Sequence, residues 1–391
     1  MHLLLNDYGG YPFPIDLSRE WVRRGERVTH VYSSASGSPH GAFASEDPAL
    51  QVVDIPTDNA KGQFIKRWRA ERQYGRRVQR LIGETRPDVV ISANTPLEAQ
   101  RCIVAACRRH DIPFVFWWQD VLSEAMVTIL GDKLGWIGRR IGLYYRRLER
   151  QLLAASDRVI CIAPQFQELL REWHLEAVPQ VLLGNWAPVE ALPVLPKDNA
   201  FSREHQLHDK FVVLYSGTLG MKQNPQIVRH AAKYLQRQDD VRLVVISNGV
   251  GMAQLQRDKE REGLDNLLLL PLQPFDRLSE ILATGDLHLV LLHASAGRFC
   301  VPSKVWSAYC AARPSLLVMP KTNYAATLTE EIGAGWVLQN DEEISLPHTI
   351  LQLKSNPELR RRMGQAGRAY AEREFPITRI ADRFNAVISS L

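Results

Sequence analysis

Residues 211–228, FVVLYSGTLGMKQNPQIV, hold the clearest structural pattern of the chain. An apolar, β-prone run comes first, a loop with Gly217 and Gly220 follows, and a helix then begins at Pro225. Asn224 stands just before that proline, and we expect its side chain to cap the helix. A strand, a glycine loop and a helix in this order predict a parallel, doubly wound α/β sheet.

The loop in this segment also has the composition of a diphosphate-binding site. Gly217 and Thr218 leave room for a ligand close to the backbone, and a helix start offers free N–H groups with a partial positive charge. Lys222 adds a full positive charge beside them. A glycine turn followed by a surface lysine is the alternative interpretation.

Strand and helix patterns alternate through most of the 391 residues. Because a chain of this length exceeds the usual size of one hydrophobic core, we expect two domains. Each should be a Rossmann-like, doubly wound domain of the α/β class, and the two should face each other across a cleft. The predicted strands form an N-terminal series at 3–5, 27–32, 51–55, 88–92, 113–117 and 158–162, and a second series at 211–215, 242–246, 267–270, 286–291 and 315–318.

Proline and polar residues mark the expected domain boundary. We assign 1–184 to an N-terminal domain, 185–200 to a linker and 201–368 to a C-terminal domain. The last segment, 369–391, is predicted to be helical and could pack back on the N-terminal domain.

The composition predicts a cytoplasmic protein that is soluble or peripheral to a membrane. It is 45% hydrophobic and 23% charged, as in ordinary globular proteins. The five cysteines are scattered without a Cys-x-x-Cys pair, which indicates reduced thiols and no metal site. The opening MHLLL is too short for a signal peptide, and no apolar run reaches the about 18 residues of a membrane span. An excess of 48 basic over 43 acidic residues is too small to predict nucleic-acid binding.

Two predicted helices, within 61–80 and 136–147, interleave basic and aromatic side chains. The first contains a single acid, Glu71. This pattern is typical of helices that adhere to anionic lipid headgroups, here at the inner face of the cell membrane. The alternative is two solvated helices whose aromatic side chains face the core.

Two further glycines and one acid are candidate site residues near the ends of N-terminal strands. Gly9 and Gly10 could let a donor phosphate or an acceptor approach the backbone, although a structural turn explains them equally well. Asp120 lies just past the strand at 113–117, where it could orient or deprotonate an acceptor hydroxyl. A helix cap or a structural carboxylate is the alternative for Asp120.

A second possible anion site is the segment VPSKVWS, residues 301–307. Pro302 precedes Ser303, which we expect to cap a helix that ends near residue 312. Lys304 would lie in the first turn of that helix, where a cation is unfavourable for the helix dipole unless an anion binds beside it. Simple solvent exposure of the lysine is the alternative.

Taken together, these segments resemble the family-4 retaining glycosyltransferases of the GT-B fold, in particular the branch that builds colanic acid, O-antigen and other bacterial surface polysaccharides. Besides residues 211–228, the resemblance is carried in chain order by LERQLLAASDRVICIAPQFQELL (148–170), LGNWAP (183–188), LQPFDRLSEILATGDLHLVLL (272–292), VPSKVWSAYCAARPSLLV (301–318) and NPELRRRMGQAGRAYAEREF (356–375).

The resemblance implies a donor held mainly by the C-terminal domain, with Lys222 on its diphosphate and no obligatory metal or other cofactor. Positive side chains and helix dipoles would stabilise the departing nucleoside diphosphate. It also implies that Asp120 matches the family's His-Asp position near the sugar, with Gln119 in place of the histidine.

The sequence departs from the family pattern at three donor-site positions. Phe299 and Ser307 stand where the family usually has paired glutamates, and Gly217 stands where an arginine is common. Relatives with a PSK segment often lack these groups too, so the losses shift donor contacts to other residues. Lys304 is our candidate for the missing charge, with Pro302, Ser303 and Ser307 beside it.

The resemblance predicts transfer of a hexose or deoxyhexose from a UDP- or GDP-sugar to a polyprenyl-diphosphate-linked saccharide, with retention of configuration. A nucleotide-sugar epimerase on the same scaffold is one alternative, although it would need acids and a histidine around the sugar. A non-catalytic subunit that binds nucleotide sugars is another, because fold does not guarantee activity.

Overall fold

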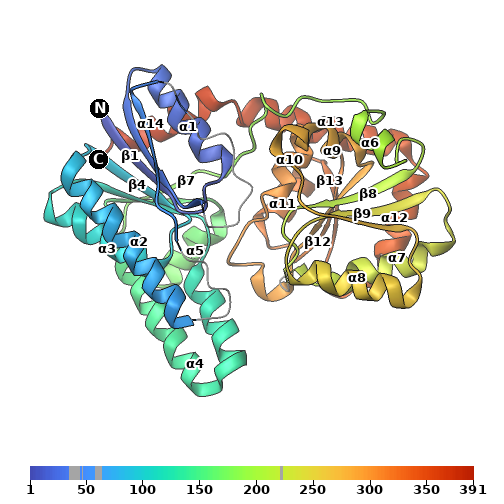
Figure 1. Cartoon of the computed structure of the whole chain (residues 1–391), viewed down its shortest axis with the longest axis horizontal. Helices are drawn as coiled ribbons and strands as arrows, with labels where there is room; N and C mark the ends of the chain where they lie inside the picture. Colours follow the sequence, from blue (N-terminus) through green and yellow to red (C-terminus); the bar gives the residue numbers. More distant parts are fainter. Residues whose placement is uncertain (35–44, 46, 58–63, 221–222) are drawn as a thin grey trace. The chain divides into compact units, whose positions relative to one another are not determined.

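The computed structural model describes residues 1–34, 45, 47–57, 64–220 and 223–391. The chain divides into two compact units, which Figure 1 shows in colours that follow the sequence. Unit 1 consists of Met1–Asn185 and Ile377–Leu391, and unit 2 is Trp186–Pro376. Unit 2 therefore includes residues 186–200 of the segment we expected to be a linker, and the C-terminal helical segment is divided at Pro376.

Unit 1 contains a parallel sheet of the order β3-β2-β1-β4-β5-β6-β7. Helix α1 joins β1 to β2, helices α2 to α5 join the strands from β3 to β7 in turn, and α14 adds the last helix from the far end of the chain. The elements are β1 (His2–Asp7), α1 (Pro12–Arg23), β2 (Arg27–Tyr32), β3 (Leu50–Asp54), α2 (Phe64–Thr85), β4 (Val89–Ala93), α3 (Leu97–Arg109), β5 (Phe114–Trp118), α4 (Leu122–Ala154), β6 (Arg158–Cys161), α5 (Pro164–Glu172), β7 (Gln180–Leu182) and α14 (Ile377–Ile388).

Unit 2 contains a second parallel sheet, of the order β10-β9-β8-β11-β12-β13. Both strand orders reverse after three strands, as in a Rossmann-like fold, which confirms the predicted class of two doubly wound α/β domains. The elements are α6 (Ala200–Glu204), β8 (Phe211–Ser216), α7 (Pro225–Tyr234), β9 (Val241–Ile246), α8 (Val250–Glu262), β10 (Leu267–Leu270), α9 (Leu278–Thr284), β11 (Leu287–Leu291), α10 (Lys304–Cys310), β12 (Ser315–Val318), α11 (Tyr324–Glu331), β13 (Gly335–Leu338), α12 (Leu346–Lys354) and α13 (Pro357–Glu374).

The strands that flank each reversal are buried along their whole length or nearly so. β4, β5 and β11 consist entirely of buried residues, and in β1 and β8 a single terminal residue is partly exposed. Parallel sheets are covered by helices on both faces, so their strands are continuous apolar runs. This explains why the sequence pattern found them.

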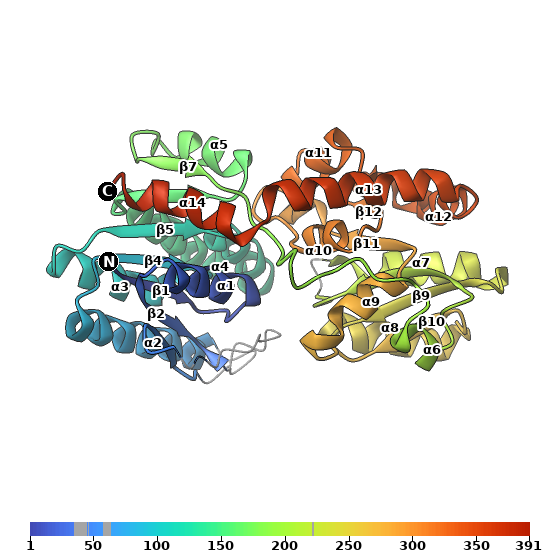
Figure 2. The same cartoon turned by 90° about the horizontal axis from the view of Figure 1, so that it is seen from above.

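The C-terminal helix α14 belongs to the core of unit 1. Figures 1 and 2 both show it beside α1. Phe384 is fully buried and packs edge-on against Trp21 and Trp117, with ring centroids 5.9 Å and 4.9 Å away. The indole N–H of Trp21 donates a hydrogen bond to Asn385 at 2.9 Å.

Helix α4 is a hairpin of two antiparallel limbs. The chain reverses at Gly135, whose φ of 56° and ψ of −132° are not helical. Gly138 and Gly142 allow the limbs to touch: a methyl group at Gly138 would collide with the carbonyl oxygen of Leu130, and one at Gly142 would lie 2.6 Å from the Cα of Val127. Figure 1 shows that the hairpin extends away from the sheet of unit 1.

A buried carboxylate fixes the start of this hairpin. Glu149, on the second limb, accepts hydrogen bonds from the backbone N–H groups of Leu122 and Ser123 and from the indole of Trp118 at 3.0–3.2 Å. It therefore satisfies N–H groups at the helix start that have no intrahelical partner. Burial raises the pKa of Glu149 to about 7.

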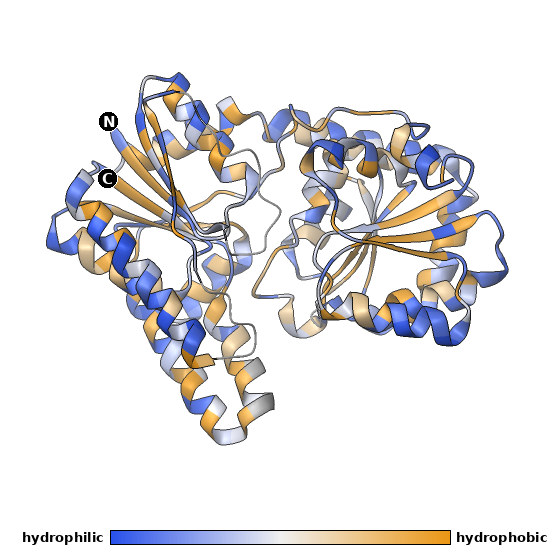
Figure 3. Cartoon of the chain, viewed as in Figure 1, coloured by the Kyte–Doolittle hydropathy of each residue, from blue (hydrophilic) through white to orange (hydrophobic). Residues whose placement is uncertain are grey.

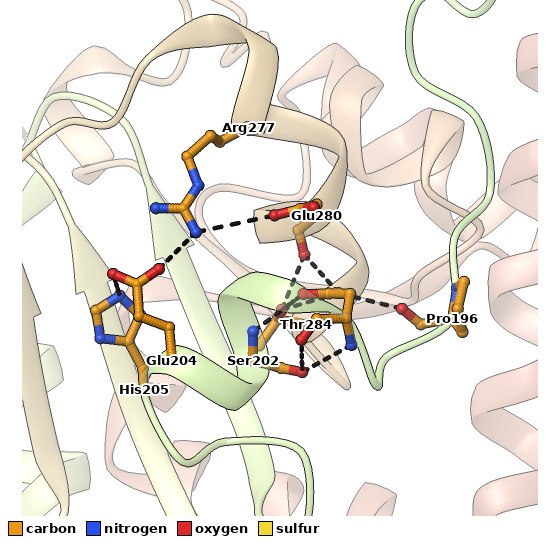
Figure 4. A network of polar contacts seen from close by, with 8 residues as sticks. Pro196, Ser202, Glu204, His205, Arg277, Glu280 and Thr284 are labelled. Atoms are coloured by element: carbon orange, nitrogen blue, oxygen red, sulfur yellow. Dashed lines mark hydrogen bonds and ion pairs between the residues drawn. The ribbon is translucent and has the colours of Figure 1, made fainter.

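The first segment of unit 2 is anchored on α9 by the polar network in Figure 4. Asn199 and Ser202 form a reciprocal capping box at the start of α6. The Asn199 amide also donates to the carbonyl oxygens of Pro196 and Glu280, each at 3.1 Å. Arg277 pairs with Glu204 at 2.7 Å. The second half of residues 185–200 thus has a defined place on unit 2.

Candidate functional site

The candidate donor residues of unit 2 gather where the strand order reverses, at the carboxyl ends of β8 and β11. The loop after β8 carries Gly217 and Thr218, and the loop after β11 leads to Ser303 and Lys304. Ligands of doubly wound sheets bind in the crevice at this point. The topology therefore unites two segments that lie far apart in the sequence.

Backbone hydrogen bonds hold the loop after β8 against the neighbouring strand. The N–H of Gly217 donates to Ile246 at 2.8 Å, and the N–H of Leu219 donates to Asn248 at 3.2 Å. Gly217 has a φ of 111°, which only glycine adopts readily. The hydroxyl of Tyr215 donates to the carbonyl oxygen of Thr218 at 2.8 Å. The loop is a rigid platform rather than a free turn.

Lys304 fills the space that the missing side chain at position 217 leaves open. A Cβ atom on Gly217 would lie 2.7 Å from the Lys304 Cε. The ammonium donates to the Thr218 carbonyl oxygen at 3.4 Å and lies 5.0 Å from the centre of the Tyr215 ring, over its face. Burial lowers the pKa of Lys304 to about 8. A cation is thus held at the point where the strand order reverses.

The expected side-chain caps beside this site are absent. Asn224 precedes α7 with a left-handed φ of 44°, and its side chain makes no capping hydrogen bond. Ser303 precedes α10, but its backbone is already helical, with φ −63° and ψ −17°, and it makes no capping bond either. An N-cap side chain reaches the helix N–H groups from an extended backbone, so neither conformation suits the role. The helix end predicted near residue 312 is confirmed, because α10 ends at Cys310 with Ala311 as its C-cap.

Lys222, the cation we assigned to the diphosphate, lies outside the described residues. The remaining candidates flank Lys304. Pro302 is half-buried just ahead of α10, and Ser307 is half-buried on α10 itself, one turn after Lys304. Phe299, which stands at the position of a family glutamate, is half-buried in the loop before them.

Asn323 holds this loop in place from the neighbouring strand connection. Its buried amide donates to the carbonyl oxygens of Gly297 and Cys300 at 2.7 Å and 2.8 Å, while its oxygen caps α11 at Ala325. The position of Lys304 therefore depends on a residue that contributes no charge.

In unit 1, Gly9 and Gly10 also lie where the strand order reverses, between β1 and β4. Gly10 has a φ of 63°, and its N–H donates to the Asp7 carbonyl oxygen at 3.0 Å. The Asp7 carboxylate accepts from the N–H of Tyr11 at 2.7 Å and from Asn94 at 2.8 Å. The glycines form a tight turn, and ligand binding beside it stays a prediction.

Asp120 is exposed just beyond β5, as its place in the sequence predicted. It is not the cap of α4, because the N-cap residue is Val121 and Glu149 accepts the first helical N–H groups. Gln119 is buried and pairs with Asn185 through reciprocal amide hydrogen bonds. The residue at the family's histidine position is therefore a structural amide.

Among the residues described, no group of three or more His, Cys, Asp or Glu side chains could hold a metal ion. None of the five cysteines forms a disulfide bond. Burial raises the pKa of Cys107, Cys161 and Cys310 to about 12, so these thiols are poor ligands and poor nucleophiles at neutral pH.

Two protein-family models together match most of the chain. The model described as "Glycosyl transferase 4-like domain" matches residues 15–186, and that described as "Glycosyl transferases group 1" matches residues 197–370. The chain belongs to the GT-B glycosyltransferases. The first model covers most of the described sheet of unit 1, and the second covers the Gly217–Lys304 site.

Two curated relatives of this glycosyltransferase are named as glycosyltransferases, one of them for colanic acid biosynthesis. WcaI of Escherichia coli K12, named for a glycosyl transferase role in colanic acid biosynthesis, is 28% identical over 48% of this chain and 46% of its own. WbjE of Pseudomonas aeruginosa, named as a glycosyltransferase, is 25% identical over 68% of this chain and 66% of its own. The chain thus spans less than two thirds of the length of both relatives.

A solved structure confirms the fold over the full length. HepE of Anabaena, solved with UDP, has a TM-score of 0.74 and 18% sequence identity, with 100% of both chains covered. Other crystals of HepE hold UDP-glucose. The GT-B fold is therefore shared, while the low identity leaves the ligands a matter for experiment.

This glycosyltransferase has a third glycine loop, which was not among the predicted site segments. Gly249, with a φ of 98°, and Gly251 follow β9, and the Gly251 N–H donates to the Leu219 carbonyl oxygen at 3.1 Å. A Cβ on Gly251 would lie 2.6 Å from the same oxygen. The signal was present as a Gly-x-Gly directly after a predicted strand and at the start of a helix.

Proposed function

We propose that this protein transfers a hexose or deoxyhexose from a UDP- or GDP-sugar to a saccharide linked to polyprenyl diphosphate, in the synthesis of a bacterial surface polysaccharide. The family supports sugar transfer, and the relatives WcaI and WbjE support the choice of product class. We assign the donor to unit 2 and the acceptor to unit 1. Retention of configuration is part of the proposal and follows from the family resemblance.

The observation that carries the proposal is the cation at the Gly217 platform. Lys304 lies beside Thr218 at the point of the sheet where ligands of such folds bind. A diphosphate there would gain a charge-assisted hydrogen bond from Lys304 in exchange for the weak one to the Thr218 carbonyl. Lys222, from the same loop, would be the second cation.

The chemistry needs stabilisation mainly of the leaving group. The bond between the anomeric carbon and the diphosphate oxygen breaks, a bond to the acceptor hydroxyl oxygen forms, and the hydroxyl proton passes to Asp120 or to the departing diphosphate oxygen. Negative charge builds on the departing nucleoside diphosphate, where Lys304 and Lys222 would neutralise it. Asp120 would orient the acceptor hydroxyl. No step requires a metal in this scheme.

Thermal-shift and calorimetric titrations with UDP- and GDP-sugars test the donor assignment. A true donor at 100 times its dissociation constant should stabilise the protein by about 2.7 kcal/mol. Lys304→Ala and Lys222→Ala should each weaken binding and turnover, whereas Lys233→Ala, an exposed lysine on α7, should not. If Lys304→Ala leaves both quantities unchanged while Lys222→Ala lowers them, the role given to Lys304 is wrong.

Product analysis separates sugar transfer from the other uses of this fold. A transferase needs an acceptor to turn over its donor, whereas an epimerase would convert the donor alone. Binding of a nucleotide sugar without conversion, across a panel of lipid-linked acceptors, would identify a non-catalytic partner subunit instead.

We place the enzyme peripherally at the inner face of the cell membrane, where a polyprenyl-linked acceptor is accessible from the cytoplasm. Among the described residues, no helix is both long enough and apolar enough to cross a bilayer. Attachment would therefore depend on a surface of the protein.

A further inference from the structure

The tip of the α4 hairpin exposes large apolar side chains to solvent. Leu134, Trp136 and Ile137 surround the reversal at Gly135, with 53%, 70% and 50% of their surfaces exposed. Leu143 and Tyr144, on the second limb, are 54% and 46% exposed. Side chains of this size are normally buried, so a cluster of them at a projecting turn calls for an explanation.

The large apolar side chains at the tip are not needed to hold the two limbs of the hairpin together. The two limbs meet through Gly138 and Gly142, which bring their backbones into contact. The limbs are thus held together without the large apolar residues at the tip, whose side chains remain outside. The hairpin presents an apolar end that the described part of the chain does not cover.

Basic side chains adjoin this apolar end. Arg139 and Arg140 follow Trp136 and Ile137 after one glycine, Gly138, and Arg147 lies two turns further on; all three arginines are exposed. Residues 134–147 contain four basic residues, Arg139, Arg140, Arg146 and Arg147, and no acid. Glu124, opposite on the first limb, is paired with Arg146 at 2.6 Å. The tip therefore carries a net positive charge.

The start of α2 is exposed as well. Helix α3 packs against both α2 and α4. Phe64 and Ile65 are 44% and 64% exposed at the first turn of α2. The basic side chains Lys66, Arg69 and Arg76 are also exposed on this helix, whereas Glu71 is buried against Arg67.

We propose that the α4 tip inserts shallowly into a membrane of anionic phospholipids, with Leu134, Trp136 and Ile137 among the acyl chains and Arg139 and Arg140 at the headgroups. Tryptophan is favoured at the depth of the headgroups, and each basic residue there adds to the attraction. An arginine pair follows each exposed apolar stretch, Arg139–Arg140 after Trp136 and Ile137 and Arg146–Arg147 after Leu143 and Tyr144. Figure 3 shows apolar and hydrophilic segments alternating along the hairpin.

This inference rests on the peripheral location proposed above but not on the donor chemistry. An experiment can therefore contradict membrane insertion without contradicting sugar transfer, and the reverse. Flotation of the full chain with vesicles of phosphatidylglycerol and phosphatidylcholine measures it directly. Wild type should float with the anionic vesicles and far less with vesicles of phosphatidylcholine alone. The double variants Trp136→Ser/Ile137→Ser and Arg139→Gln/Arg140→Gln should each bind roughly tenfold or more weakly.

Control variants elsewhere on the surface show whether the loss of vesicle binding is specific to the tip or follows from removing any exposed apolar or basic side chain. Ile344→Ser removes an equally exposed apolar side chain of unit 2, and Arg108→Gln/Arg109→Gln removes a tandem pair of exposed arginines on α3; both should float like wild type. Because all these residues are exposed, the variants should keep the wild-type melting temperature and donor affinity. A loss of donor affinity with unchanged flotation would affect only the proposed function.

Three results would overturn the membrane inference. The first is a wild-type protein that does not float with anionic vesicles. The second is a set of tip variants that float as well as wild type. The third is equal binding of the wild type to anionic and to phosphatidylcholine vesicles. Self-association of the wild type that Trp136→Ser/Ile137→Ser abolishes, without any vesicle binding, would assign the tip to a second copy of the chain.

Discussion

At the scale of single residues, the site depends on one glycine and one lysine that lie far apart in the sequence. Gly217 opens the space, and Lys304 occupies it, within reach of the Thr218 carbonyl oxygen. The sequence suggested each residue as a donor contact. Their proximity is consistent with the proposal that Lys304 supplies the positive charge that an arginine at position 217 would carry.

The lowered pKa of Lys304 predicts that donor binding depends on pH. The ammonium is charged below its pKa of about 8 and neutral above it. Because a bound diphosphate favours the charged form, affinity for UDP should fall as pH rises above about 8, by up to about tenfold per pH unit. Lys304→Arg should remove this dependence, since guanidinium stays charged. Calorimetry from pH 7 to about 9.5 would check it; equal slopes for both proteins would contradict the prediction.

A methyl group at position 217 should displace the Lys304 side chain. In Gly217→Ala, the new Cβ would lie 2.7 Å from the Lys304 Cε, and the φ of 111° would be strained by about 1–3 kcal/mol. We expect lower stability and altered affinity for UDP. Gly263→Ala is the control, because its φ of 64° is also strained while no atom lies within 4 Å of the new Cβ. That variant should lose stability only; altered UDP affinity in it would argue against a specific contact at 217.

At the scale of elements, the sequence pattern of α4 predicted an amphipathic helix but not the reversal of the chain within it. The interleaved basic and aromatic residues of 136–147 were predicted to form an amphipathic helix. Tyr145 is buried, as the core alternative expects, while Trp136 is largely exposed, as the membrane interpretation expects. One helix serves both purposes because Gly135 turns the chain back.

Glu149 should make the stability of unit 1 depend on pH. Its pKa is about 7 in the folded protein against 4.5 for the ordinary carboxyl, so between these values the folded state binds more protons than the unfolded state. Stability should therefore fall as pH rises from 4.5 to about 7, by roughly 3 kcal/mol at most. In Glu149→Gln this slope should disappear. The variant should also be less stable by roughly 1–3 kcal/mol, since its NH₂ group faces a backbone N–H donor.

Urea denaturation at several pH values would test this prediction. Glu124→Gln, which alters a partly exposed carboxylate on the same hairpin, is the control and should keep the wild-type slope. A Glu149→Gln protein with the same pH slope as wild type would show that the carboxyl does not hold its proton in the fold.

At the scale of the whole molecule, the last helix completes the core of the first unit. Phe384→Ala should destabilise unit 1 by roughly 3–5 kcal/mol, because the ring is buried between Trp21 and Trp117. Tryptophan fluorescence during denaturation reports on these contacts. Leu391→Ala, at an exposed position, should leave the transition unchanged. An unchanged transition in Phe384→Ala would mean that α14 is not part of the unit that unfolds.

Much of the fold could be predicted from the sequence because its strands and helices depend on interactions between neighbouring residues. Strands such as 211–215 and 113–117 are unbroken apolar runs, since both faces of a parallel sheet are buried. Helical spacing and glycine positions then supplied the alternation of strand and helix. These features depend only on neighbouring residues, so the α/β class and the two-domain organisation follow from them.

Capping and site geometry depended on contacts that the local pattern does not contain. Asn224 and Ser303 have suitable side chains for caps, yet the surrounding chain places their backbones in conformations that cannot make the bonds. Conversely, α4 is capped by Glu149, which lies 26 or more residues away in the chain. A local pattern names the residue type that can cap a helix, but the packing selects the residue that does.

The amino-acid sequence alone determined that this chain forms two doubly wound α/β domains, that it resembles sugar-transferring enzymes and that Lys304 could supply positive charge. Only the tertiary structure decided that Lys304 lies against the Gly217 platform, that α14 joins unit 1 and that α4 turns back on itself with an exposed apolar tip. Periodicity and propensity arise from interactions within a few residues. Contacts between distant segments arise from the order in which strands assemble into a sheet, which no single segment encodes.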